Sequence, residues 1–362
     1  MGLCGDKGMK KSFEEVFEDQ TKYGTKVKTE EYCISGAHII VDQGQGQIAG
    51  YTDREDGLFA DVPAIVFGDH TRVIKYVDTP FYLGADGVKV LRSRFENANY
   101  RYLYYALKSA RIPNTGYNRH YKWLKETRIN YPDAERQAEI VRILDRVMEV
   151  IGKRQQQLNA YDDLIKARFV EMFGDLRINK KGWGLRSFDD LTVLITDGEH
   201  ATPKRTSEGI YLLSARNILN HAIRLDDVDY IDQEEYDRIA KRVIPTEGDV
   251  LISCSGTVGR CCAVPADLKF QMVRSAALLR FKPEIKPKFA EYMITSDFIQ
   301  EQINQSKTAS SQANLFQGKI AKLKGFVPPI DMQEQFTDFI SQVDKSKSHK
   351  KTNYKTNNKL AS

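Results

Sequence analysis

The chain has 362 residues, enough for two or more domains, and its apolar content of 41% and charged content of 28% are those of an ordinary soluble globular protein. The net charge of +5 permits nucleic acid as a partner but does not by itself indicate it. The sequence shows no secretory signal, no apolar run of about 20 residues and no C-x-x-C pair among its five cysteines, so we expect a cytoplasmic protein without a membrane span, a disulfide framework or a metal site.

The first globular domain is expected to occupy residues 1–131. Short β-branched runs at residues 37–41, 63–67, 72–77 and 88–91 predict strands, because turn-forming residues bound them. Residues 99–110 predict a short helix, which Pro113 ends.

Residues 132–174 predict a long spacer helix with a stop at Gly174. Asp133 can cap its start. Apolar residues recur three and four positions apart over several heptads, a pattern typical of a helix that packs against a partner helix along one narrow seam. At 1.5 Å per residue the helix is about 60 Å long. The predicted seam residues are Ile140, Leu144, Val147, Ile151, Leu158 and Ile165.

The second globular domain is expected at residues 175–327, with strands at residues 210–213, 250–253 and 277–281 and a helix at residues 289–305. The partner helix follows within residues 328–362, where Asp331 and Glu334 have capping-box spacing. Its seam residues are Phe336, Ile340 and Val343. After Val343 the seam is lost, so we expect a shortened spacer helix and a basic, disordered tail.

The two halves of the chain resemble one another. Residues 12–16 match residues 187–191, residues 68–72 lie over residues 256–260, and residues 132–147 overlay residues 328–343. The offset grows in order, from 175 residues between Ser12 and Ser187 to 196 residues between Pro132 and Pro328. An internal repeat follows. We therefore predict a mixed α+β fold with two similar globular domains joined by two long antiparallel helices in a pseudo-twofold arrangement.

Two similar domains held apart by a stiff rod suit a ligand with a long repeat. DNA is such a ligand, since half-sites on one face recur every ~34 Å. A two-domain scaffold protein that never touches DNA would have the same rod, so that alternative stays open.

Several motifs occur in the order typical of one family. They are PDxxxQxxIxxIL at residues 132–144, FVEMFGD at 169–175 followed by KGW at 181–183, TDG with His200 and Pro203 at 196–203, GDVLIS at 248–253, and PP through DKSK at 328–347. In this order the chain resembles the specificity subunit of type I restriction–modification enzymes over nearly its whole length. The first domain's GQGQIAGY and FGDHTR segments are similar to one version of that family's recognition domains.

The resemblance implies two target-recognition domains, each reading one half of a split sequence in double-stranded DNA. It also implies that the paired helices set the gap between the halves and dock methyltransferase (modification) subunits, which restriction/translocase subunits join. This chain would then be a non-catalytic targeting subunit without a cofactor, and S-adenosylmethionine would be bound by the partner methyltransferase.

Candidate DNA contacts lie in loops that follow the predicted strands. Small hydroxyls and arginines there can contact phosphates, an arginine can bind guanine, and an asparagine can bind adenine. The alternatives are arginines paired with local carboxylates and, for the glycine-rich loop, a dinucleotide-binding loop or a plain turn. The candidates are Gly44, Gln45, Gly46, Gln47, Gly68, Asp69, His70, Thr71, Arg72, Asp197, Gly198, His200, Thr202, Arg216, Asn217, Ser253, Ser255, Gly256, Thr257 and Arg260.

Enzymatic alternatives find little support in the sequence. A methyltransferase acting on an exocyclic base nitrogen would need an Asn/Asp-Pro-Pro-aromatic loop, which is not present. Asp267, Glu284 and Lys286 have nuclease-like spacing, but such triplets arise often by chance, so a magnesium-dependent nuclease is a minor alternative.

Overall fold

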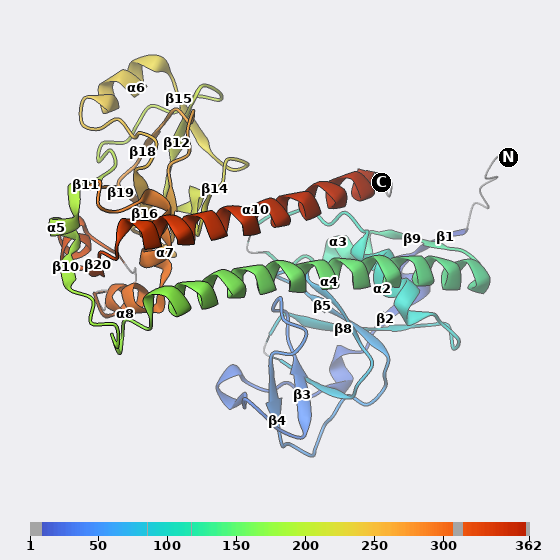
Figure 1. The fold of residues 1–362 in the computed structure, drawn as a ribbon. Coiled ribbons are helices and arrows are strands. Elements are labelled where there is room, and N and C mark those ends of the chain that lie inside the picture. The colour runs from blue at the N-terminus through green and yellow to red at the C-terminus, as the bar shows by residue number, and fades with distance from the viewer. Residues whose placement is uncertain (1–8, 85, 117, 307–313, 360–362) are drawn as a thin grey trace. The chain divides into compact units, whose positions relative to one another are not determined.

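The computed structural model describes residues 9–84, 86–116, 118–306 and 314–359, and of residues 348–359 only the helical backbone. It divides into two compact units, Met1–Arg154 and Gln155–Ser362. One continuous helix, α4 (Ala134–Phe173), runs from the first unit into the second (Figure 1).

The described part of unit 1 contains three sheets. The strands β1 (Met9–Ser12) and β9 (Arg128–Tyr131) form an antiparallel pair. The second sheet has the order β2-β8-β5-β6, and the third has the order β4-β3-β7, in which β3 and β7 are parallel. Their bounds are β2 (Phe17–Asp19), β3 (His38–Val41), β4 (Gly50–Thr52), β5 (Ala64–Gly68), β6 (Ile74–Val77), β7 (Phe81–Leu83) and β8 (Val88–Ser93). The helices are α1 (Phe13–Val16), α2 (Tyr100–Lys108), α3 (Tyr121–Lys125) and two 3-10 turns, Thr21–Tyr23 and Thr29–Glu31.

The local sequence explains these elements. The central strand β5 is buried along its whole length, as its unbroken apolar run predicts. Asn99 accepts the Tyr102 backbone N–H at 3.0 Å and so caps α2. The four predicted strands and the predicted helix of this unit are confirmed, with ends displaced by no more than two residues.

Unit 2 repeats these sheets. The strands β10 (Leu185–Ser187) and β20 (Lys324–Phe326) pair, and the other sheets have the orders β11-β19-β16-β17 and β15-β12-β18, with β12 and β18 parallel. Their bounds are β11 (Thr192–Asp197), β12 (Ile210–Leu213), β15 (Asp229–Ile231), β16 (Val250–Ser253), β17 (Cys261–Ala263), β18 (Phe270–Met272) and β19 (Ala276–Phe281). The helices are α5 (Phe188–Leu191), α6 (Gln233–Ala240), α7 (Pro287–Thr295), α8 (Asp297–Ser306) and α9 (Gln317–Lys322), with a 3-10 turn at Ala215–Asn217.

The strand orders confirm the internal repeat. Each strand of unit 1 has a counterpart with the same neighbours and the same parallel or antiparallel direction in unit 2. Both copies also open with a capping box, at Ser12 and Glu15 and at Ser187 and Asp190. The hairpin of β13 (Ile218–Leu219) and β14 (Ala222–Ile223) and the helix α6 are additions to unit 2 between β12 and β16, and they account for most of its extra length.

The helix predicted at residues 289–305 is wrong in one respect, because it consists of two helices. Ser296 has φ −65° and ψ 150°, an extended conformation that separates α7 from α8. Its carbonyl accepts the first hydrogen bonds of α8, from the N–H groups of Ile299 and Gln300. Serine followed by aspartate is a helix start signal, so the break has a local cause.

Both long helices begin with a glutamine side chain that donates to the carbonyl of a proline five residues earlier. The Asp133 carboxylate accepts the Arg136 N–H at 2.8 Å, as predicted, and Gly174 ends α4 with φ +80°. The Gln137 amide donates to the Pro132 carbonyl at 2.8 Å. In α10 (Ile330–Lys359) the buried Gln333 amide donates to the Pro328 carbonyl at 2.9 Å, whereas Asp331 already lies inside the helix and is not its cap.

Within unit 2 the end of α4 packs antiparallel against the start of α10. The rings of Phe173 and Phe336 lie 5.5 Å apart. Asp162 lies eleven residues before Phe173 on α4, and it forms an ion pair at 2.7 Å with Lys347, which lies eleven residues after Phe336 on α10. The predicted seam residues Ile165, Phe336, Ile340 and Val343 are buried in this contact.

The seam is less regular along the rest of α4. Ile140 packs on the core of unit 1, and Leu144, Ile151 and Leu158 are half-buried. Val147 is 38% exposed and belongs to no core cluster of the described residues, so its place in the seam stays a prediction.

The second helix is shorter than the first, with 30 residues against 40 in α4, but it does not end near Val343. α10 continues to Lys359, so the expectation of a disordered tail is wrong up to that residue, and residues 360–362 lie outside the described part. Losing the apolar seam removes side-chain burial but not the backbone hydrogen bonds, and lysine is a good helix former.

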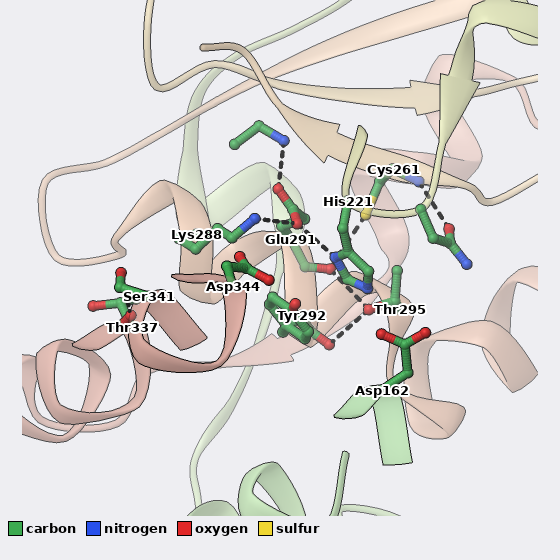
Figure 2. Close-up of polar contacts among 12 residues, drawn as sticks. Asp162, His221, Cys261, Lys288, Glu291, Tyr292, Thr295, Thr337, Ser341 and Asp344 are labelled. Atoms are coloured by element: carbon green, nitrogen blue, oxygen red, sulfur yellow. Dashed lines mark hydrogen bonds and ion pairs between the residues drawn. The ribbon is translucent and has the colours of Figure 1, made fainter. Parts of the chain in front are cut away.

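A buried polar cluster ties the added hairpin of unit 2 to α7 (Figure 2). The Glu291 side chain is 1% exposed and contacts His221 Nδ1 at 2.5 Å, Lys288 Nζ at 2.9 Å and the Ala263 N–H at 2.7 Å. Burial acts to raise the pKa of Glu291, but the His221 hydrogen bond and the Lys288 charge outweigh it and hold the pKa below its usual value. The His221 ring stacks on Tyr292 at 4.0 Å.

We expect Phe336→Ala to lower the free energy of unfolding by about 3–5 kcal/mol, because it leaves a cavity among Phe169, Phe173 and Tyr292. Phe316→Ala is the matched control, since Phe316 is 60% exposed and its loss is expected to cost no more than about 0.5 kcal/mol. Denaturant unfolding of the full chain measures both, and equal effects would contradict the helix contact.

Candidate nucleic-acid interface

Three loops of unit 1 meet through main-chain hydrogen bonds. The Asp69 N–H, in the β5–β6 hairpin turn, donates to the Gly87 carbonyl in the β7–β8 connection at 2.7 Å. The His120 N–H, in the loop between α2 and α3, donates to the Asp69 carbonyl at 2.8 Å. Because backbone groups make these bonds, the meeting point does not depend on side-chain identity.

Unit 2 has the same bonds at the equivalent places. The Cys254 N–H, in the β16–β17 turn, donates to the Ser275 carbonyl in the β18–β19 connection at 2.8 Å. The Leu315 N–H, just before α9, donates to the Cys254 carbonyl at 2.9 Å. We call each meeting point a loop junction: Asp69, Gly87 and His120 in unit 1, and Cys254, Ser275 and Leu315 in unit 2.

A fourth loop joins the junction of unit 1 through Gln43. Its side-chain oxygen accepts the His70 N–H at 3.1 Å, its carbonyl accepts the Thr71 hydroxyl at 2.6 Å, and its amide donates to the Asp86 carbonyl at 3.0 Å. Gly87 has φ +89°, and a Cβ there would lie 2.8 Å from the Gln43 amide. Glycine is therefore required at this position.

The predicted contacts of unit 1 fall into two groups. Gly44, Gln45, Gly46 and Gln47 lie in the loop of the β3–β4 hairpin; the last three are exposed. No helix follows this loop, so the dinucleotide-binding alternative is wrong.

The β5–β6 turn holds the other group. Gly68 is buried, and Thr71 is exposed at the turn. Asp69 is 4% exposed and accepts the Tyr121 N–H at 2.7 Å, so it stabilises the turn and we correct its assignment as a contact. Arg72 has φ +61° and donates to the Ile112 carbonyl at 3.2 Å, which ties the turn to the α2–α3 loop.

A cavity of about 520 Å³ lies at the junction of unit 2. On one side, Asp197 contacts His200 Nε2 at 2.8 Å and the Arg242 guanidinium at 2.5 Å, and so fixes the imidazole. The residues around the cavity are polar apart from three, and they are Asp197, His200, Cys254, Ser255, Arg274, Ser275, Asn314, Leu315, Phe316 and Gln317.

The structure corrects two predicted contacts in unit 2. Asn217 is 0% exposed, donates to the Arg224 and Asp227 carbonyls and accepts the Ser214 N–H, so it stabilises its own loop and cannot reach a base edge. Ser253 is also fully buried, and its hydroxyl donates to the Thr257 carbonyl.

The other predicted residues of unit 2 differ in accessibility. Gly198 is buried against the β18–β19 connection, where a Cβ would lie 2.3 Å from the Met272 carbonyl oxygen. Arg216 pairs with Asp229 at 2.9 Å, which is the local-carboxylate alternative. The exposed residues are His200, Thr202, Arg216, Gly256 and Thr257.

The two turns are not aligned as the sequence suggested. The Gly68 N–H bonds to the Val73 carbonyl, whereas the Ser253 N–H bonds to the Arg260 carbonyl, so Arg260 occupies the position of Val73 rather than that of Arg72. The turn of unit 2 is two residues longer, which sequence matching without gaps cannot detect.

Sequence reasoning missed Arg274. Every arginine of unit 2 except Arg260 and Arg274 forms an ion pair with a carboxylate among the described residues. Arg274 is exposed, lines the cavity and follows the strand β18, so the strand-end argument used for Arg72 and Arg216 applied to it as well.

The described residues give no support to the nuclease-like site considered above. Glu284 pairs with Arg186 at 2.9 Å and Lys286 pairs with Glu334 at 2.7 Å, so two members of the nuclease-like triplet serve as structural ion pairs. Within the residues that the structure describes, no group of three or more His, Cys, Asp or Glu side chains is placed to bind a metal ion, and no helix has the length and apolar character needed to cross a membrane.

Comparison with known proteins gives similarity both to a protein sequence and to a solved structure. The specificity subunit of the type I restriction enzyme EcoR124I/EcoR124II of Escherichia coli is 28% identical over 167 residues, which is 41% of either chain. The crystal structure of a type I restriction–modification S subunit from M. genitalium is 14% identical with a TM-score of 0.52, over 98% of this chain and 94% of that one. This second similarity supports the fold.

The decisive match is to a family described as the type I restriction modification DNA specificity domain. It covers residues 7–160 and 182–358, so each copy of the repeat is matched separately. The chain belongs to this family of type I restriction–modification DNA specificity proteins.

Proposed function

We propose that the chain is the DNA sequence-recognition subunit of a type I restriction–modification complex and reads a bipartite target in double-stranded DNA. The observation that carries this proposal is the loop junction, which has the same backbone hydrogen bonds in both units but different side chains around them. A conserved backbone frame with different side chains suits two domains that bind the same kind of ligand but read different bases.

The chain's own contribution is binding and positioning, without catalysis and without a cofactor. Methylation of a base requires extruding it from the duplex, and this subunit holds the duplex in register while a partner methyltransferase, which binds S-adenosylmethionine, does so. Exposed arginine, hydroxyl and amide side chains at the junctions supply the phosphate and base contacts.

The helices dock the modification subunits, which the restriction/translocase subunits then join. In support, α4 carries exposed apolar residues four and three positions apart, Ile143 at 52%, Val147 at 38% and Val150 at 50%. Such a stripe on one helix face is typical of a protein–protein contact.

A scaffold protein that never binds DNA is the competing function, and the salt dependence of binding separates the two. We expect the logarithm of the binding constant for duplex DNA to fall steeply with the logarithm of salt concentration, with a slope near −0.9 per phosphate contacted. Titrations of the full chain at several salt concentrations measure this slope. Binding that is absent, or independent of salt, would favour the scaffold.

Arg72→Ala should weaken binding to one half-site by about ten-fold and leave discrimination at the other unchanged. The guanidinium holds the α2–α3 loop on the β5–β6 turn and can reach a phosphate or guanine. Competition binding with duplexes altered in one half measures the effect. Arg54→Ala is the control, since Arg54 is engaged by Asp56 at 2.9 Å. An equal loss at both halves would refute the division between the two units.

Insertion of four residues after Arg154 should change the preferred gap between half-sites. One added turn lengthens the helix by about 6 Å, close to the rise of two base pairs. Binding to a set of duplexes whose gaps differ by single base pairs measures the preference. An unchanged optimum would show that α4 does not act as the spacer.

A further inference from the structure

Each loop junction carries three side chains at equivalent positions that the family assignment leaves unassigned. One position directly follows the junction residue of the hairpin turn. The other two directly precede the junction residues of the two other loops. In unit 1 they are His70, Asp86 and Arg119, and in unit 2 they are Ser255, Arg274 and Asn314. We call these six residues the junction set.

The three positions of each unit lie around its loop junction. In unit 2, Ser255, Arg274 and Asn314 all line the same 520 Å³ cavity. In unit 1, a Cβ at Gly87 would lie 2.9 Å from the His70 ring, and Gln43 accepts the His70 N–H and donates to the Asp86 carbonyl, so His70 and Asp86 are neighbours. Arg119 directly precedes His120, whose N–H donates to the Asp69 carbonyl of the same junction. The equivalent backbone bonds therefore place three side chains around the junction of each unit.

The chemistry at the three positions differs between the units. Unit 1 offers an imidazole, a carboxylate and a guanidinium, whereas unit 2 offers a hydroxyl, a guanidinium and an amide. These groups match different base edges: a guanidinium binds guanine O6 and N7, an amide binds adenine N6 and N7, and a carboxylate accepts from cytosine N4.

A base edge suits these positions better than a phosphate does. Each junction has a carboxylate beside it, Asp86 in unit 1 and Asp197 in unit 2. Carboxylates repel phosphates but accept hydrogen bonds from bases. Arg274 has no carboxylate partner among the described residues, so binding a base would break no existing ion pair.

We infer that the junction set determines base specificity, with His70, Asp86 and Arg119 reading one half of the target and Ser255, Arg274 and Asn314 reading the other. This inference rests on the proposed function and adds to it the residues that discriminate. The shared backbone bonds hold both sets in one frame, so their side chains can be exchanged between units without altering the loops.

The test is selection from random duplexes by the full-length chain together with the modification subunits. The wild type should select two half-site sequences separated by a fixed gap. Arg274→Ala should reduce selection of one or two base pairs in a single half by about ten-fold. Arg186→Ala is the matched control, because it removes an arginine that pairs with Glu284, and it should select the wild-type sequence.

A graft of the unit 1 residues into unit 2, S255H/R274D/N314R, sharpens the test. It should change the preference of the same half that Arg274→Ala affects and leave the other half unchanged, with an unaltered circular dichroism spectrum and melting temperature. Asp86→Arg should change only the other half.

The outcomes distinguish a failure of the proposed function from a failure of the inference about the junction set. If the wild type selects no sequence, the proposed function fails. If the wild type selects two half-sites but Arg274→Ala and the graft select the same ones, the inference is wrong and the proposed function stands. If these variants lower affinity equally for every sequence, the junction set contacts phosphates, and the inference is again wrong.

Discussion

The structure of each unit depends on two main-chain hydrogen bonds that join a hairpin turn to two loops distant in sequence. A loop packed at such a point would otherwise leave buried N–H and C=O groups unpaired, at a cost of about 1–3 kcal/mol each. Pairing them with one another fixes the loops without any particular side chain. This frame is present twice, although the residues that make it, Asp69 and Cys254 among them, are chemically unrelated.

The contact between α4 and α10 shows a second constraint. Phe169 and Phe173 of α4 meet Phe336 of α10 in a group of aromatic rings that also includes Phe289 and Phe326, so the helix contact is continuous with the core of unit 2. Aromatic residues contribute large buried areas and preferred ring geometries. The narrow apolar seam predicted from the sequence is therefore part of a larger hydrophobic core at the point where the two helices meet the globular part of unit 2.

Local patterns made much of this fold predictable. Alternation, capping residues and the Gly174 stop depend on near neighbours, and the strands, the cap at Asp133 and the 40-residue helix followed from them. The repeat was visible because both copies kept their capping boxes and helix starts. The extent of α10 was misjudged because loss of an apolar seam was taken as loss of the helix.

The candidate interface was only partly predictable. The correct turns were predicted, since polar residues after buried strands mark loop ends. The junctions, however, join residues up to 61 positions apart, as between Cys254 and Leu315. Asn217 has the chemistry of a base reader, and only its burial shows that it stabilises its own loop instead. The two hairpin turns differ in length by two residues, and this difference can likewise be recognised only from the pairing registers of their strands.

The contact between Gln43 and Gly87 implies an evolutionary coupling. In unit 1 the long Gln43 side chain fills the space that a Cβ at residue 87 would need. In unit 2 the Ser275 hydroxyl occupies the corresponding place and accepts the N–H of Ala215, whose short side chain leaves room for it. One arrangement pairs a large residue with glycine, and the other pairs alanine with serine. Among relatives of this chain, the two positions should covary, with a change at one tolerated only when the other compensates for its volume.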